Sequence, residues 1–141
     1  MKTKLNTSLV FNGNCADALA FYEKVFDVKA EIAGRYKDAP TSDGMPGGFD
    51  NPKYANYIMH AEIKFNENQE LHFADMPDAP AFNDSFGISL AFDTVEKAKQ
   101  IFKELSQGGK IVQDIGETFW SKCFGNCKDK FGVDWMISVI E

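Results

Sequence analysis

Ser8-Leu9-Val10-Phe11 returns 81 residues later as Ser89-Leu90-Ala91-Phe92. Three further identities follow at the same displacement, pairing Phe21 with Phe102, Glu23 with Glu104 and Lys29 with Lys110. Both copies have the same order of features: a short apolar strand, a helix, and a strand that begins with Lys. The repeat therefore predicts two similar modules, and modules of this kind usually pack face to face with a ligand groove between them.

The hydrophobic pattern extends each copy into a longer series of elements. In the first half it predicts strands over 5–11, 29–36, 57–65 and 70–74, and a helix that begins at Cys15 and is capped by Asn14. In the second half it predicts strands over 86–93, 110–117, 120–128 and 135–140, and a helix capped by Thr94. Each half reads βαβββ. We expect an α+β fold in which two βαβββ modules form a cupped, open β-barrel-like sheet with the helices outside.

The segments between these elements divide the chain. Module one covers about 1–76, a linker about 77–85 and module two about 86–141, within a single domain over 1–141. Residues 37–53 contain turn-forming residues without periodicity, which is typical of a lid or a binding loop. Gly132, in the turn before the last strand, is expected to have a positive φ.

Composition restricts the possible partners. The net charge is −6 and the chain lacks a basic cluster, which argues against nucleic acid and anionic membranes. The first residues lack the apolar stretch of a signal peptide, so we expect a cytoplasmic protein. The number of cysteines is odd, which indicates free thiols: Cys15, Cys123 and Cys127. Thirteen Phe residues are enough to fill a core and also to line an apolar pocket.

Three stretches resemble a known family. They are Phe11 to Tyr22, Leu71-His72-Phe73-Ala74-Asp75-Met76-Pro77, and Glu117 to Ile137 with its Asp129-Lys130-Phe131-Gly132 turn. With the βαβββ order they resemble the vicinal oxygen chelate superfamily (glyoxalase I, bleomycin-resistance proteins, extradiol dioxygenases), and more closely its PhnB-like branch. Some members of this branch are labelled as ubiquinone-pathway methyltransferases, but this chain lacks a Gly-rich loop that would hold an adenosyl cofactor.

The resemblance implies where a divalent metal would be held. The ligands would come from equivalent strands of the two modules, near Asn6 or Thr7, near Phe86 or Gly87, and at about Met136. None of these is a usual ligand, so we interpret the ancestral metal site as lost and expect no cofactor. A rebuilt metal site is the alternative, from the four ligand-type residues of two strands that pair in our prediction: His60, Glu62, Glu70 and His72.

Other residues are candidates for binding or catalysis. His60 and Glu117 are the candidate acid–base groups. The candidate ligand-binding residues are His72, Asp75, Tyr57, Trp120 and Trp135, the two Trp rings forming an apolar wall from adjacent strands. Each has a structural alternative: a solvated strand face for the His residues, a turn cap for Asp75, the polar position of a strand for Glu117 and core packing for the Trp residues.

Three functions follow from these patterns. The first is a homodimeric protein that binds a small apolar or aromatic molecule without a metal, as bleomycin-resistance proteins do. The second is a divalent-metal-dependent lyase, isomerase or dioxygenase. The third is an interaction protein whose dimer surface is the functional part. Metal content separates the first two, and a cavity between the sheets would argue against the third.

Overall fold

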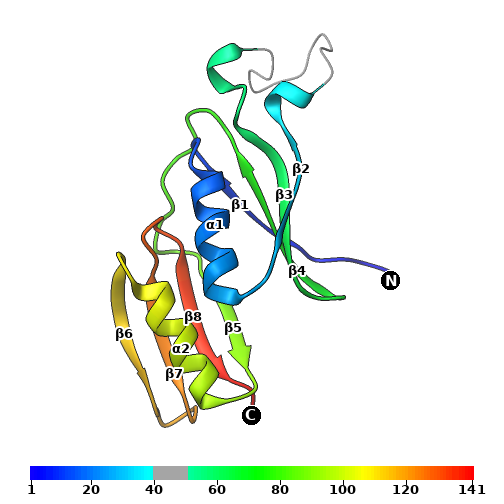
Figure 1. Ribbon diagram of the computed structural model, residues 1–141. Helices are drawn as coiled ribbons and strands as arrows, with labels where there is room; N and C mark the ends of the chain where they lie inside the picture. Colours follow the sequence, from blue (N-terminus) through cyan, green and yellow to red (C-terminus); the bar gives the residue numbers. More distant parts are fainter. Residues whose placement is uncertain (40–50) are drawn as a thin grey trace. The chain divides into compact units, whose positions relative to one another are not determined.

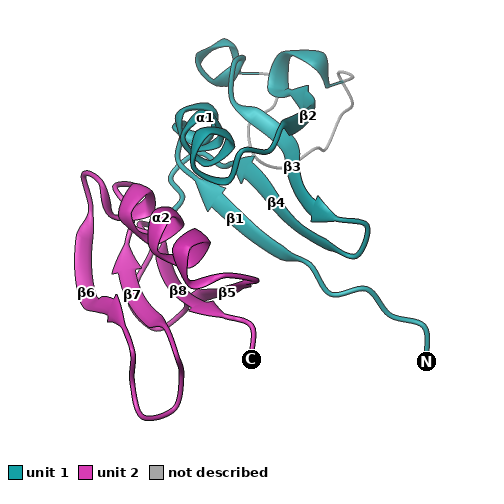
Figure 2. Ribbon diagram, turned by 60° about the horizontal axis from the view of Figure 1, so that its bottom comes forward, with its two compact units in different colours: residues 1–80 teal, residues 81–141 magenta. Residues whose placement is uncertain are grey.

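The computed structural model describes residues 1–39 and 51–141, which divide into two compact units, 1–80 and 81–141 (Figure 2). The first unit contains a helix and four strands: β1 (Thr7–Phe11), α1 (Cys15–Phe26), β2 (Ala30–Arg35), β3 (Ile58–Asn66) and β4 (Gln69–Asp75). The second repeats this order: β5 (Ile88–Phe92), α2 (Val95–Ser106), β6 (Lys110–Gly116), β7 (Phe124–Lys128) and β8 (Asp134–Val139). The predicted α+β fold with two βαβββ modules is confirmed (Figure 1).

The two sheets have the same topology. Their strand orders are β1-β4-β3-β2 and β5-β8-β7-β6. In each sheet the first strand runs parallel to the last strand of its module, and the other pairs are antiparallel. The first strand of each module is thus at a sheet edge, next to the strand that ends the module.

Helix α1 covers one face of the first sheet. Tyr22 meets Phe73 of β4 at a ring-centroid distance of 5.9 Å, and Phe26 meets Phe65 of β3 edge to face at 5.3 Å. Burial alternates along β4, where Leu71, Phe73 and Asp75 are buried and the residues between them are half-buried. The sheet therefore has an apolar face under the helix and an opposite face that carries polar side chains.

The second unit is built around α2 and a buried tryptophan. The predicted cap is confirmed, because Thr94 Oγ1 accepts a hydrogen bond from the Lys97 N–H at 3.1 Å. Trp135 is fully buried and its Nε1 donates to Asp129 Oδ2 at 2.8 Å. Gly132 has a φ of +90°, as predicted, in the turn that Asp129 stabilises.

Two local predictions need correction. Helix α1 begins at Cys15 with Asn14 at the N-cap position, as predicted, but the Asn14 side chain makes no cap hydrogen bond. The acceptor there is Asp75, whose Oδ1 accepts from the Gly13 N–H at 2.8 Å and from the Cys15 N–H at 3.0 Å. Parallel pairing of Phe11 with Asp75 brings this carboxylate to the helix start. The strand predicted from Trp120 begins only at Phe124, because the preceding residues form a turn closed by the Thr118 N–H and the Ser121 carbonyl.

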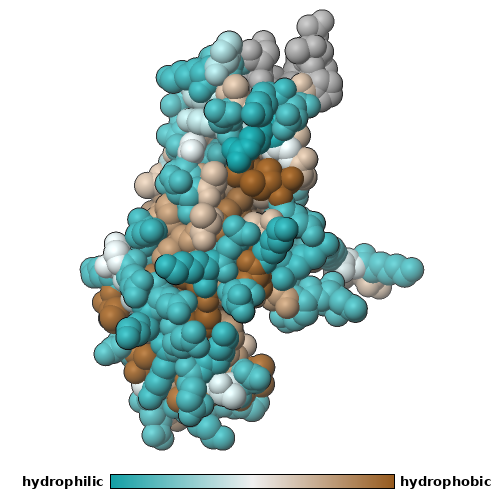
Figure 3. All heavy atoms as spheres, in the orientation of Figure 1, coloured by the Kyte–Doolittle hydropathy of each residue, from teal (hydrophilic) through white to brown (hydrophobic). Residues whose placement is uncertain are grey.

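The described ends of the predicted 37–53 loop form two short 3₁₀ turns, η1 (Tyr36–Asp38) and η2 (Pro52–Tyr54). Residues 40–50, on which the lid prediction depends, are outside the described part of the chain. All three cysteines are buried free thiols, as predicted. Within residues 1–39 and 51–141, neither helix has the length and apolar character that a membrane span needs. Figure 3 shows a surface on which hydrophilic residues predominate, with scattered apolar patches.

Candidate functional site

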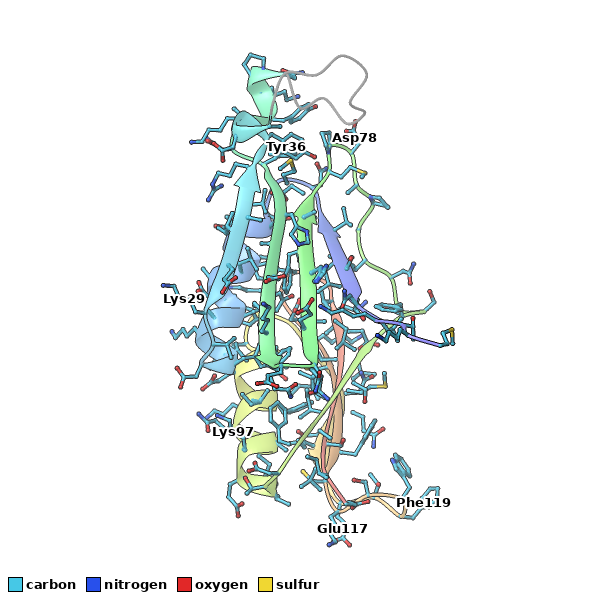
Figure 4. The ribbon with its side chains drawn as sticks, turned by 90° about the vertical axis from the view of Figure 1, so that its right-hand side faces the viewer. Lys29, Tyr36, Asp78, Lys97, Glu117 and Phe119 are labelled. Carbon is cyan, nitrogen blue, oxygen red and sulfur yellow. The ribbon has the colours of Figure 1, made fainter. Side chains whose placement is uncertain are left out.

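A row of polar side chains crosses the first sheet on the face opposite α1. The register places Ser8 of β1 beside His72 of β4, His72 beside Glu62 of β3, and Glu62 beside Glu31 of β2. Directly paired residues point to the same face of a sheet, so these four side chains form one line across it. Figure 4 looks onto this face, with the four strands of the sheet in front of α1.

His72 is at the centre of this row and has three ligand-type neighbours. Its Nε2 lies 2.8 Å from Glu70 Oε1 and 4.0 Å from Glu62 Oε2. The His60 ring meets the His72 ring edge to face, with centroids 4.9 Å apart. The structure therefore brings together all four residues that the sequence proposed for a rebuilt site, and we call them the His72 cluster: His60, Glu62, Glu70 and His72.

Two lysines that the sequence analysis missed complete the electrostatics. Lys4 Nζ lies 2.7 Å from Glu70 Oε1, and Lys64 Nζ lies 3.3 Å from Glu62 Oε1. The Glu70 carboxylate accepts a hydrogen bond from Lys4 and forms another with His72. Together these two hydrogen bonds lower the pKa of Glu70 to about 2. Lys64 lies two residues from Glu62 on β3, so both side chains point to the same face, and the sequence contained the information for this pair. Lys4 precedes β1, and only the β1–β4 register shows that it reaches Glu70.

The second module provides an internal comparison for this row. Its topologically equivalent positions are Ser89, Met136, Asn126 and Gln113, which pair across β5, β8, β7 and β6 in the same way. Ser8 and Ser89 are identical, but His72 corresponds to Met136, and Glu62 corresponds to Asn126. The same sheet thus forms without any ionisable side chain in this row, so the His72 cluster is not a requirement of the fold.

The other sequence candidates lie elsewhere or are buried. Asp75 is 4% exposed and its two carboxylate oxygens accept from Gly13, Cys15 and Ile58, so its predicted ligand contact is wrong and the turn-cap alternative holds. Tyr57 is half-buried and packs against Tyr36 and Tyr54, with ring centroids 5.7 and 4.9 Å away. It remains a candidate for ligand binding.

The predicted wall of two tryptophans does not form. Trp135 is 0% exposed and belongs to the core, whereas Trp120 is 51% exposed and packs against Phe119 and Phe124 at 4.8 and 5.5 Å. Glu117 and Phe119 lie in the β6–β7 loop, labelled in Figure 4, and both are exposed. Trp120 keeps an accessible ring, but it is a loop residue rather than part of a strand.

The family resemblance places metal ligands at positions whose side chains do not suit a divalent ion. Asn6 and Thr7 offer neutral oxygens, Phe86 and Gly87 have no side-chain donor, and Met136 offers a thioether. A metal site shared between equivalent strands of both modules therefore does not fit these residues, and we derive no chemistry from it. Ligand-type donors are concentrated within the first unit, in the His72 cluster.

Comparison with known proteins agrees with the fold. The sequence model of the Glyoxalase/Bleomycin resistance protein/Dioxygenase superfamily matches residues 4–137. Protein YjdN of Escherichia coli K12 is 33% identical over 142 residues, which cover 97% of this chain and 95% of that protein.

Two solved structures are also similar over nearly the full length. Protein PA1353 of Pseudomonas aeruginosa has a TM-score of 0.80 and 28% identity, with 98% of each chain covered. A PhnB protein of Bacillus cereus, described as a putative 3-demethylubiquinone-9 3-methyltransferase, has a TM-score of 0.72 and 27% identity, covering 98% of this chain and 100% of that one. The chain belongs to the glyoxalase/bleomycin resistance/dioxygenase superfamily and to its PhnB-like branch.

Proposed function

We propose that the chain is a PhnB-like small-molecule-binding protein whose ligand contacts the polar face of the first sheet at His72. The observation that carries this proposal is the internal comparison between the modules. The row containing His72 and Glu62 is ionisable in the first module and neutral in the second, although both sheets have the same topology.

The energetics of the row support a role other than stability. Glu31 and Glu62 are direct cross-strand partners, and like charges in that position are destabilising. Accessible ion pairs such as Lys64 with Glu62 contribute only about 0–1 kcal/mol. Titratable groups gathered where the fold does not need them are typical of binding and catalytic sites.

The side chains also define what the site recognises. His72 is 21% exposed and Glu62 is 23% exposed, so both are accessible while their positions are fixed by the sheet. Imidazole nitrogens and carboxylate oxygens together donate and accept hydrogen bonds. This favours a small molecule with several hydrogen-bonding groups over the purely apolar ligand expected from the two tryptophans, one of which is buried.

The test is a fragment titration that distinguishes the His72 face from the Trp120 loop. Benzylamine, benzoate and phenol are added in turn to chelator-treated ¹⁵N-labelled protein, and amide shifts are mapped. We expect shifts confined to β3 and β4 that disappear in His72→Ala and persist in Glu67→Gln, a control in the exposed β3–β4 turn. Shifts confined to residues 117–124, or no shifts with any of the three compounds, would contradict the proposal.

A further inference from the structure

We infer that the first unit contains a transition-metal site of its own, formed by His60, Glu62 and His72. One ligand atom from each of these residues can be chosen so that all three lie within 4.8 Å of one another. All three come from the adjacent antiparallel strands β3 and β4. The site therefore lies within one module, unlike a site assembled from equivalent strands of both. Ion binding does not depend on the proposed small-molecule binding and is measured with the metal alone.

The side chains are close to the spacing that an ion requires. Around a tetrahedral Zn²⁺ with bonds of about 2.0–2.1 Å, ligand atoms are about 3.4 Å apart. A separation of at most 4.8 Å can close to that value by side-chain rotation, without a change in strand register. All three residues are half-buried, so they are accessible to an ion from solvent.

The local hydrogen bonds leave suitable donor atoms for the ion. Glu62 pairs with Lys64 through Oε1, which leaves its Oε2 for an ion. His72 Nε2 is within hydrogen-bonding distance of Glu70 Oε1, and donation by Nε2–H leaves the lone pair on Nδ1. A carboxylate that orients a metal-ligating imidazole in this way is a common second partner of metal sites. We therefore assign Glu70, held by Lys4, as a positioning residue outside the ligand set.

The donor set selects the class of ion. Two imidazoles and one carboxylate suit Zn²⁺ and its neighbours Co²⁺ and Ni²⁺, whereas Mg²⁺ and Ca²⁺ prefer sets made only of oxygen. Three protein ligands also leave a coordination position for solvent or for a donor atom of a bound molecule. The expected ion is thus a borderline transition metal held in an open site.

Isothermal titration of chelator-treated, tag-free chain with ZnCl₂ in excess MgCl₂ tests the site. We expect one Zn²⁺ per chain. His60→Ala, Glu62→Gln and His72→Ala should each weaken binding by more than the roughly 10- to 100-fold that loss of an outer-shell partner costs, and Glu70→Gln should fall within that range. Glu67→Gln, which removes a carboxylate from the β3–β4 turn, should bind as the unmodified chain does. Far-ultraviolet circular dichroism checks that each variant is folded.

Two further measurements make the outcome specific. Binding of Co²⁺ should produce a visible absorption band that is lost in His72→Ala. In Glu70→Gln the side-chain ¹⁵N shifts of His72 should change in the absence of metal, because the hydrogen bond that sets its tautomer is altered. The absence of saturable Zn²⁺ binding, equal binding by His60→Ala, or equal binding by His72→Ala would overturn the inference. Fragment shifts at His72 without Zn²⁺ binding would refute the metal site alone and leave the proposed function standing.

Discussion

Replacing Asp75 with Ala tests how the first unit is held together. The substitution removes a buried carboxylate and leaves three backbone N–H groups without their acceptor: those of Gly13, Cys15 and Ile58. A buried donor without a partner costs about 1–3 kcal/mol. Because Gly13 is exposed and water can replace its acceptor, two donors count, and we expect Asp75→Ala to lower the free energy of unfolding by about 2–6 kcal/mol. That is a large fraction of the roughly 5–15 kcal/mol that stabilises a typical domain.

Asp75→Asn is the companion variant, since Asp75→Ala is expected to be close to unfolding. The amide keeps one acceptor oxygen for Gly13 and Cys15 but places an NH₂ group opposite the Ile58 N–H. We expect this variant to lose one hydrogen bond to a charged acceptor, or about 1.5–3 kcal/mol. Urea unfolding followed by circular dichroism measures both losses. Native-state hydrogen exchange at Cys15 and Ile58 shows whether the effect is local to the helix start and β3.

The control removes an exposed carboxylate. Asp93→Asn, at an exposed position before α2, should change stability by less than about 0.5 kcal/mol. If Asp75→Ala were equally mild, the three N–H groups would not depend on this carboxylate, and the proposed role of Asp75 would be refuted. A loss detected only by the fluorescence of the two tryptophans, which belong to the second unit, would refute it as well.

Three further predictions test other parts of the structure. Gly125→Ala should lower stability by about 1–3 kcal/mol in urea unfolding, because the added Cβ would lie 2.8 Å from both Ile115 Cβ and Phe102 Cε2; an unchanged midpoint would show that β6 and α2 can both shift to make room. Because the folded pKa of Glu70, about 2, is below its ordinary value of 4.5, its contribution is present above pH 4.5 and is lost as the pH falls toward 2. Lys4→Met should raise that pKa in a ¹³C NMR titration, and an unchanged value would exclude the Lys4 hydrogen bond as its main cause. Burial raises the pKa of all three thiols, so alkylation at mildly alkaline pH should be slow until the chain unfolds, and rapid reaction of the native chain would contradict the burial of Cys15, Cys123 and Cys127.

Sequence patterns predicted the elements best where buried and accessible residues alternate along a strand, as in β4, β7 and β8. They located the β3–β4 hairpin, and the structure adds the register that places Glu62 beside His72. They also predicted the cap of α2, because Thr94 is three residues from the N–H that it satisfies. These features depend on local spacing, which a single sequence contains.

Features that depend on distant register were missed. The first N–H groups of α1 need a hydrogen-bond acceptor, and local spacing predicted Asn14. In the structure the acceptor is Asp75, which lies on a strand 60 residues later in the sequence. Lys4 reaches Glu70 for the same kind of reason, over 66 residues. Trp120 was wrongly predicted to belong to a strand for a different reason. An aromatic residue next to an alternating pattern is typical of a strand, but here a turn at Thr118 keeps Trp120 out of β7.

The repeat separates what the fold requires from what it permits. Where both modules have the same structural need, they meet it with different residues: α1 receives its acceptor from Asp75, whereas α2 has its own cap in Thr94. Where a residue has no structural task, the copies are free to diverge, as His72 and Met136 have done at equivalent places in β4 and β8. Neither core packing nor helix capping explains a polar residue at the position of His72. The same reasoning assigns Asp75 to structure and the His72 cluster to function, although Asp75 and His72 lie three residues apart on β4.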